Sequence, residues 1–188
     1  MRLNDPLVTS FFFCDVEYPI DLSFDNVLDV LDVFRDPNLF KRQKVELGIE
    51  LLIGATDLEF LNLLEMWDFI RVEFILLGED SGPETDELGN EMPTKSNKSI
   101  DLVADAKYIY ASFRQIGINL FQEQGKLSWQ EFQALLVSLP DDTIMQRIIQ
   151  IRNWEPQKGM DAKEKKKMRE LQRKYALPNT LREEEDDE

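Results

Sequence analysis

The sequence predicts a mainly α protein: a helical domain with a short N-terminal β-hairpin, a flexible acidic linker and a basic C-terminal helix. Apolar residues recur at helical spacing through most of the 188 residues. β-prone runs separated by a turn occur near the N-terminus. Helical periodicity is lost in a polar, acidic stretch before the middle of the chain. We therefore expect four regions, at residues 1–77, 78–99, 100–156 and 157–188.

The first region begins with a predicted hairpin at residues 7–20. Its apolar first strand ends at Phe13, a turn lies near Asp15, and Pro19 restricts the second strand to a sheet edge. Helical periodicity then predicts three helices, at about residues 25–34, 39–53 and 57–77.

The second half carries its own helix signals. A helix is predicted at about residues 101–115, and a capping box formed by Ser128 and Glu131 indicates the start of the next. Asp141 and Asp161 can each cap a further helix. We expect an aromatic core in this half, built from Ile109, Phe113, Trp129 and Phe132. Residues 78–99 have no periodicity and little apolar content, so we expect a flexible linker there.

Composition excludes several classes of function. A formal net charge of −15 counts against nucleic-acid binding, which depends on clustered Lys and Arg. The sequence has no histidine, so Ser-His-Asp and Cys-His catalysis are excluded. Its one cysteine, Cys14, lies in an apolar run, and we expect a buried small hydrophobic residue. We expect no enzyme activity, no cofactor and no metal site. Acidic residues within 57–77 and the lack of signal-peptide features also predict no membrane association.

Two helices of the first region carry candidate partner-binding residues. Four aspartates recur at spacings of four, three and four residues and so share one helix face: Asp25, Asp29, Asp32 and Asp36. This acidic stripe is either a solvated face or a docking surface for a basic partner or for the basic C-terminal region of the chain itself. The helix at 57–77 is apolar around most of its circumference, so it is either a central core helix or a helix whose surplus apolar surface binds a partner. Its candidate contacts are Leu61, Trp67 and Phe74.

The C-terminal region separates its charges. Residues 158–182 hold nine Lys or Arg against three Asp or Glu, whereas residues 183–188 are all acidic. The basic helix has only a thin apolar strip, formed by Met168, Leu171 and Tyr175. This pattern fits either a solvated helix with an acidic tail or a helix that docks on a partner or on another copy of the chain.

The order of motifs between residues 101 and 177 resembles a family of bacteriophage tail assembly chaperones. The motifs are D-A-x-x-I-Y-A-x-F, G-I-x-L, L-x-W-x-x-F-x-A-L-L-x-x-L-P-x-D-T, I-x-x-I-R and K-Y-A-L. The opening L-N-D-P-L, followed by a hairpin and an acidic helix, is similar to the start of that family. Genes of this family usually lie just upstream of the tape-measure gene in siphophages.

The resemblance implies a non-enzymatic assembly factor in the cytoplasm of the infected bacterium. Such a protein binds the long, aggregation-prone tape-measure protein, keeps it soluble, helps to recruit tail-tube subunits, and is absent from the mature virion. Self-association of the chaperone is also compatible with the basic helix. The alternative that composition leaves open is an acidic adaptor or inhibitor that binds a basic partner, either by mimicking nucleic acid or by binding a host factor.

Overall fold

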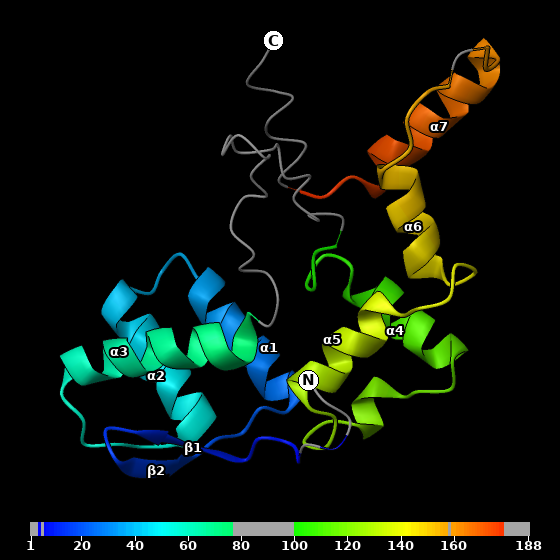
Figure 1. Cartoon of the computed structure of the whole chain (residues 1–188). Helices are drawn as coiled ribbons and strands as arrows, with labels where there is room; N and C mark the ends of the chain where they lie inside the picture. The colour runs from blue at the N-terminus through cyan, green and yellow to red at the C-terminus, as the bar shows by residue number, and fades with distance from the viewer. Residues whose placement is uncertain (1–3, 5, 77–99, 158, 179–188) are drawn as a thin grey trace, which may run out of the picture. The chain divides into compact units, whose positions relative to one another are not determined.

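The computed structural model describes residue 4 and residues 6–76, 100–157 and 159–178 (Figure 1). The predicted linker at 78–99 and the acidic tail at 183–188 lie outside the described residues. The chain divides into two compact units, which are described one at a time below. The first comprises residues 1–92 and 121–135, and the second comprises residues 93–120 and 136–188.

The predicted hairpin is present in the first unit. Strands β1 (Ser10–Phe13) and β2 (Val16–Pro19) pair antiparallel, with Phe13 opposite Val16. The two turn residues have positive φ, 49° at Cys14 and 62° at Asp15, as a two-residue type I′ turn requires. Cys14 is exposed, so the prediction of a buried cysteine is wrong. The apolar run ends in the turn itself, where Cys14 has no layer to pack against.

Three helices form the core of this unit: α1 (Phe24–Arg35), α2 (Lys41–Ile53) and α3 (Phe60–Ile70). Phe34 of α1 stacks on Trp67 of α3, with ring centroids 4.1 Å apart. Gly48 of α2 makes this stack possible, since a Cβ there would lie 2.9 Å from the Phe34 ring. The fully buried aliphatic side chains around it are Val27, Val30, Val45, Ile49, Leu52, Met66 and Ile70.

The helix predicted at 57–77 is shorter and changes its winding. After α3 the chain continues as a π-helical turn, η1 (Arg71–Ile75). Wider winding brings residues five apart toward the same side of the helix. Phe69 and Phe74 accordingly meet edge to face at 5.8 Å, and both rings contact Phe11 of β1. The π turn thus places two aromatic rings against Phe11 of the hairpin. Helical periodicity alone did not predict this contact.

Residues 121–135 also belong to this first unit. Main-chain hydrogen bonds run from Trp129 to the Leu22 carbonyl at 2.7 Å and from Phe24 to the Leu127 carbonyl at 2.9 Å. The Trp129 indole donates to the Ile75 carbonyl at 2.9 Å. Trp129 and Phe132 are buried, as predicted. The contacts of this segment with Leu22, Phe24 and Ile75 were not predicted, because sequence patterns had assigned Trp129 and Phe132 to the region 100–156.

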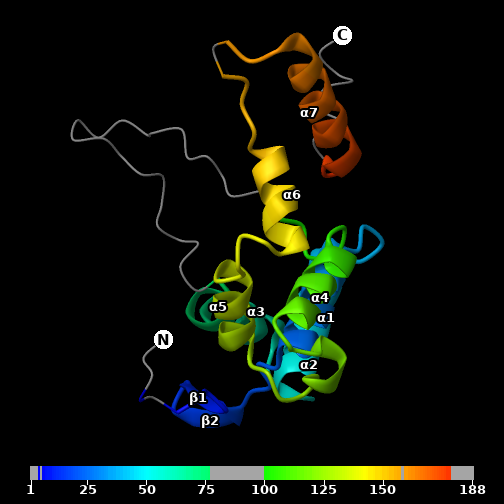
Figure 2. The same cartoon turned by 90° about the vertical axis from the view of Figure 1, so that its right-hand side faces the viewer.

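The second unit contains α4 (Ala106–Gln115), α6 (Ile144–Arg152) and α7 (Ala162–Tyr175). The short 3-10 turn η2 (Leu120–Gln122) and helix α5 (Trp129–Val137) each include residues of both units. The capping box of Ser128 and Glu131 at the start of α5 is confirmed. Figure 2 shows α7 beside α6, its neighbour in this unit. The mainly α fold with one N-terminal hairpin is confirmed. Across the described residues, no helix combines the length and hydropathy needed to span a bilayer.

Candidate binding surfaces

The first and last carboxylates of the acidic stripe of α1 accept hydrogen bonds within the unit, whereas the two between them are exposed. The Asp25 carboxylate accepts a hydrogen bond from the Gly125 amide at 2.9 Å and so holds residues 121–128 against α1. Asp36 accepts from both the main chain and the side chain of Asn38 after the helix ends. Asp29 and Asp32 are exposed. A partner would therefore meet two of the four predicted carboxylates without displacing an internal contact.

The solvent-facing side of α3 and η1 combines apolar and acidic groups. Leu61, Glu65, Asp68 and Val72 are all exposed and recur at spacings of four, three and four residues, so they lie on one face. Leu61 is 70% exposed. Arg71 lies 3.9 Å from the Asp68 carboxylate, at the outer limit of an ion pair. We call these four residues the α3 outer face. The sequence predicted an apolar partner surface on this helix, but it did not predict that Glu65 and Asp68 belong to the same exposed face.

The other candidate residues on this helix point inward. Trp67 is buried in the stack with Phe34, and Phe74 is half-buried in the cluster with Phe11 and Phe69. These two aromatic side chains hold the helix and the hairpin in place. Only Leu61 of the three predicted contacts lies where a partner can reach it directly.

The apolar strip of α7 packs within the second unit. Met168, Leu171 and Tyr175 are all half-buried, and the Tyr175 ring meets the Tyr108 ring edge to face at 6.0 Å. Gln172 donates to the Trp154 carbonyl at 2.8 Å. The exposed basic side chains lie on the remaining surface of the helix: Lys163, Lys166, Lys167, Arg169, Arg173 and Lys174. The strip is thus a docking face of α7 on its own unit.

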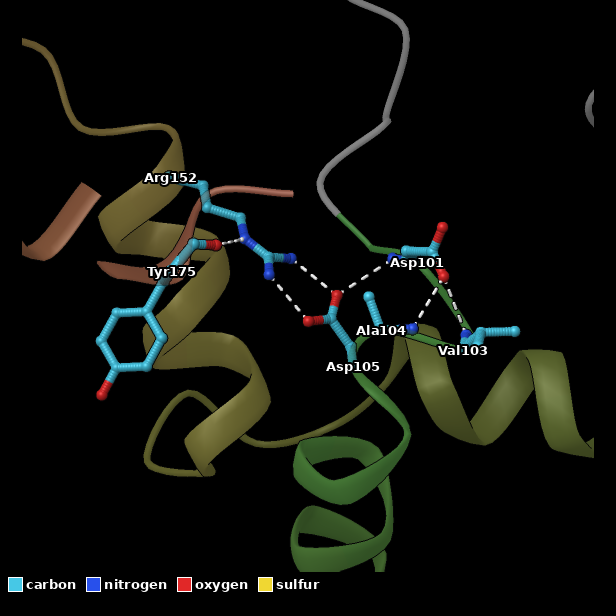
Figure 3. A network of polar contacts seen from close by, with 6 residues as sticks. All are labelled: Asp101, Val103, Ala104, Asp105, Arg152 and Tyr175. Carbon is cyan, nitrogen blue, oxygen red and sulfur yellow. Dashed lines mark hydrogen bonds and ion pairs between the residues drawn. The ribbon is translucent and has the colours of Figure 1, made fainter. Parts of the chain in front are cut away.

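An ion pair joins the three helices of the second unit (Figure 3). The Arg152 guanidinium donates to both carboxylate oxygens of Asp105, each at 2.7 Å. Its Nε donates to the Tyr175 carbonyl at 2.7 Å. Asp105 also accepts from the Asp101 amide at 3.0 Å. The start of α4, the end of α6 and the end of α7 therefore meet at one arginine.

The sequence did not predict that Asp105, Arg152 and Tyr175 contact one another. Its members nevertheless stand in three of the motifs quoted for the resemblance: D-A-x-x-I-Y-A-x-F begins with Asp105, I-x-x-I-R ends with Arg152, and K-Y-A-L contains Tyr175. The burial of the pair indicates a structural role, since a bidentate arginine–carboxylate pair fixes geometry strongly. The polar residues within these otherwise apolar motifs were the feature of the sequence that could have indicated the cluster.

The described residues contain no group of three or more Cys, Asp or Glu side chains placed to hold a metal ion. The described residues present exposed carboxylates and aliphatic side chains on the α3 outer face, exposed carboxylates on α1, and exposed ammonium and guanidinium groups on α7. Such surfaces bind other macromolecules through burial of apolar area and charge complementarity.

A family model described as Bacteriophage Gp15 protein matches residues 3–177 of the chain. No curated protein and no solved structure matches it. The matched range takes in the hairpin, all the helices described above and the three motifs that supply the Asp105–Arg152 cluster.

Proposed function

The chain belongs to the bacteriophage Gp15 protein family, and we propose that it is a tail assembly chaperone that binds the tape-measure protein through the α3 outer face. Membership makes it a bacteriophage protein and supports a role in the structure or morphogenesis of the particle. The order of motifs in residues 101–177, which resembles the tail assembly chaperones, supports the finer assignment.

The observation that carries the proposal is the composition of the α3 outer face. Leu61 and Val72 offer apolar surface about three helical turns apart, roughly 17 Å at 1.5 Å per residue. Glu65 and Asp68 lie between them and are exposed. An amphipathic helix that carries Lys or Arg beside its apolar stripe complements both kinds of group. Helices of this type are abundant in long helical proteins such as the tape-measure proteins implied by the resemblance.

The charge of the chain supports the same kind of client. Asp29 and Asp32 of α1 add exposed carboxylates to the first unit, and the whole chain carries −15. Long-range attraction of this kind raises the rate of association with a basic client and weakens as salt is added. Under this proposal the chaperone acts in the cytoplasm of the infected cell, brings tail-tube subunits to the client, and leaves before the virion matures.

The test is co-expression of the chain with the tape-measure protein of the same phage. Leu61→Asp is the informative variant because Leu61 is exposed and lies in the first turn of α3, where an aspartate is compatible with the helix. We expect the parent chain to keep the tape-measure protein soluble and Leu61→Asp to lose most of that effect. Val103→Asp, which alters an exposed valine of the second unit, is the matched control.

Two results would overturn the proposal. The tape-measure protein could be equally soluble without the chain, or mature tails could contain the chain in stoichiometric amount, which would make it a structural subunit. Asp29→Lys separates the electrostatic contribution, because its effect on solubility should shrink at high salt.

A further inference from the structure

The two edges of the β1–β2 sheet differ in what they offer to another strand. The Ile20 amide donates to the Thr9 carbonyl at 2.9 Å, which fixes Thr9 and Ile20 as a hydrogen-bonded pair. Because such pairs alternate along an antiparallel ladder, Phe11 and Phe13 also direct their main-chain groups toward β2. The amides and carbonyls of Ser10 and Phe12 therefore point away from it.

The edge of β2 is closed to further pairing and the edge of β1 is open. Pro19 has no amide, and it stands where β2 would have to donate outward. On the β1 side, no group in the described part of the chain hydrogen-bonds to the outward main chain of Ser10 or Phe12. The Phe12 side chain beside this edge is 69% exposed. Natural sheets usually protect such an edge with a charge, a proline or a bulge, and β1 has none of these.

We propose that β1 pairs antiparallel with β1 of a second copy of the chain, which extends the hairpin to a four-stranded sheet across a two-fold axis. The register that uses both outward residues places Ser10 opposite Phe12 of the other copy, with the two Phe11 residues opposite each other at the axis. Each Phe12 side chain then faces a small serine. Registers centred on Ser10 or Phe12 would pair one outward residue with the turn or with the segment before the strand.

Charge does not oppose a second copy at this edge, although it does over most of the chain. Two chains of −15 repel each other over most of their surface. Residues 6–14, which read PLVTSFFFC, contain no charged group. Two β1 edges can therefore approach without placing like charges opposite each other across the new pair of strands. An identical strand also presents the complementary donors and acceptors by symmetry.

The exposed Cys14 allows the proposal to be tested on the full chain without engineering a label site, because it is the only cysteine. We expect analytical ultracentrifugation to show a concentration-dependent dimer. Spin labels on Cys14 should lie about 20 Å apart, measured between the attached backbones, since six residue steps of about 3.4 Å separate them in this register. Parallel pairing would bring them into direct contact instead.

Two variants block the edge and one controls for them. Ser10→Pro removes an outward amide, and Phe12→Lys adds a charge at the edge; each should raise the dimer dissociation constant at least ~10-fold with the melting temperature of the monomer preserved. Val16→Lys adds the same charge to the same hairpin on β2 and should leave the dimer intact. A parent chain that stays monomeric, or a dimer that survives both edge variants, would overturn the proposal. Equal weakening by Val16→Lys would show general charge sensitivity and would also overturn it.

Discussion

The Asp105–Arg152 pair should be the most sensitive polar contact of the second unit. Asp105 is 1% exposed and the Arg152 side chain 11%. Arg152→Met keeps the aliphatic stem but leaves the carboxylate buried without its partner. Removing one member of a buried pair costs about 3–5 kcal/mol. The lost bond to the half-buried Tyr175 carbonyl adds about 1 kcal/mol or less, because water can replace it. We expect a loss of about 4 kcal/mol in the free energy of unfolding of this unit.

Urea unfolding, together with native-state hydrogen exchange of the α6 amides, measures this loss. Three further variants separate its causes. Arg152→Lys keeps the charge without the planar fork and should lose about 1–2 kcal/mol. Combining Arg152→Met with Asp105→Leu removes both charges and should restore at least about half of the lost stability. Arg42→Met breaks the exposed Arg42–Glu46 pair and should change stability by less than about 0.5 kcal/mol.

A loss of less than about 1 kcal/mol in Arg152→Met, the range expected of an exposed pair, would contradict this role of the Asp105–Arg152 pair. A double variant that is no more stable than Arg152→Met would contradict it as well. That outcome would place the stabilisation in packing around the arginine stem rather than in the compensation of a buried charge.

Trp129→Phe should lose about 1–3 kcal/mol in urea unfolding, because the Ile75 carbonyl is left without its buried donor; a change below about 0.5 kcal/mol would show that water replaces the indole. Replacing Cys14-Asp15 by Asn-Gly should raise the free energy of unfolding by about 1 kcal/mol, since both residues have positive φ. An unchanged melting temperature would contradict this. Ser112→Ala should lose about 1–3 kcal/mol because an α6 amide loses its buried acceptor, and a neutral result would refute that role.

Local patterns predicted the elements of this fold well. The predicted hairpin turn and the edge position of Pro19 follow from chemistry within a few residues, and both are present. The capping box at Ser128 is confirmed for the same reason. The start of α7 after Asp161 is also as predicted. These features need no information from distant parts of the chain.

Features that depend on distant residues were missed or misread. The π turn after α3 brings Phe69 and Phe74 onto Phe11, which lies more than fifty positions earlier. Residues 121–135 join the N-terminal unit through main-chain bonds, and main-chain bonds leave little trace in side-chain periodicity. Cys14 shows the reverse error: a hydrophobic neighbourhood in sequence predicted burial, whereas the turn placed it in solvent.

The candidate surfaces were predicted in part. Helical spacing placed the four aspartates on one face, but it could not show that α1 ends before Asp36 or that Asp25 and Asp36 already have internal partners. It likewise could not separate the exposed Leu61 from the buried Trp67, since both lie in a helix that is apolar around most of its circumference. Which side of such a helix faces solvent is decided by its neighbours.

Site-specific photocrosslinking at position 61 in phage-infected cells is the most direct test of whether the α3 outer face binds the tape-measure protein. A photoreactive residue in place of Leu61 should form a covalent adduct with the tape-measure protein before tails are complete, and the same residue in place of Val103 should not. Adducts with the tape-measure protein at both positions, or at neither, would contradict binding through the α3 outer face.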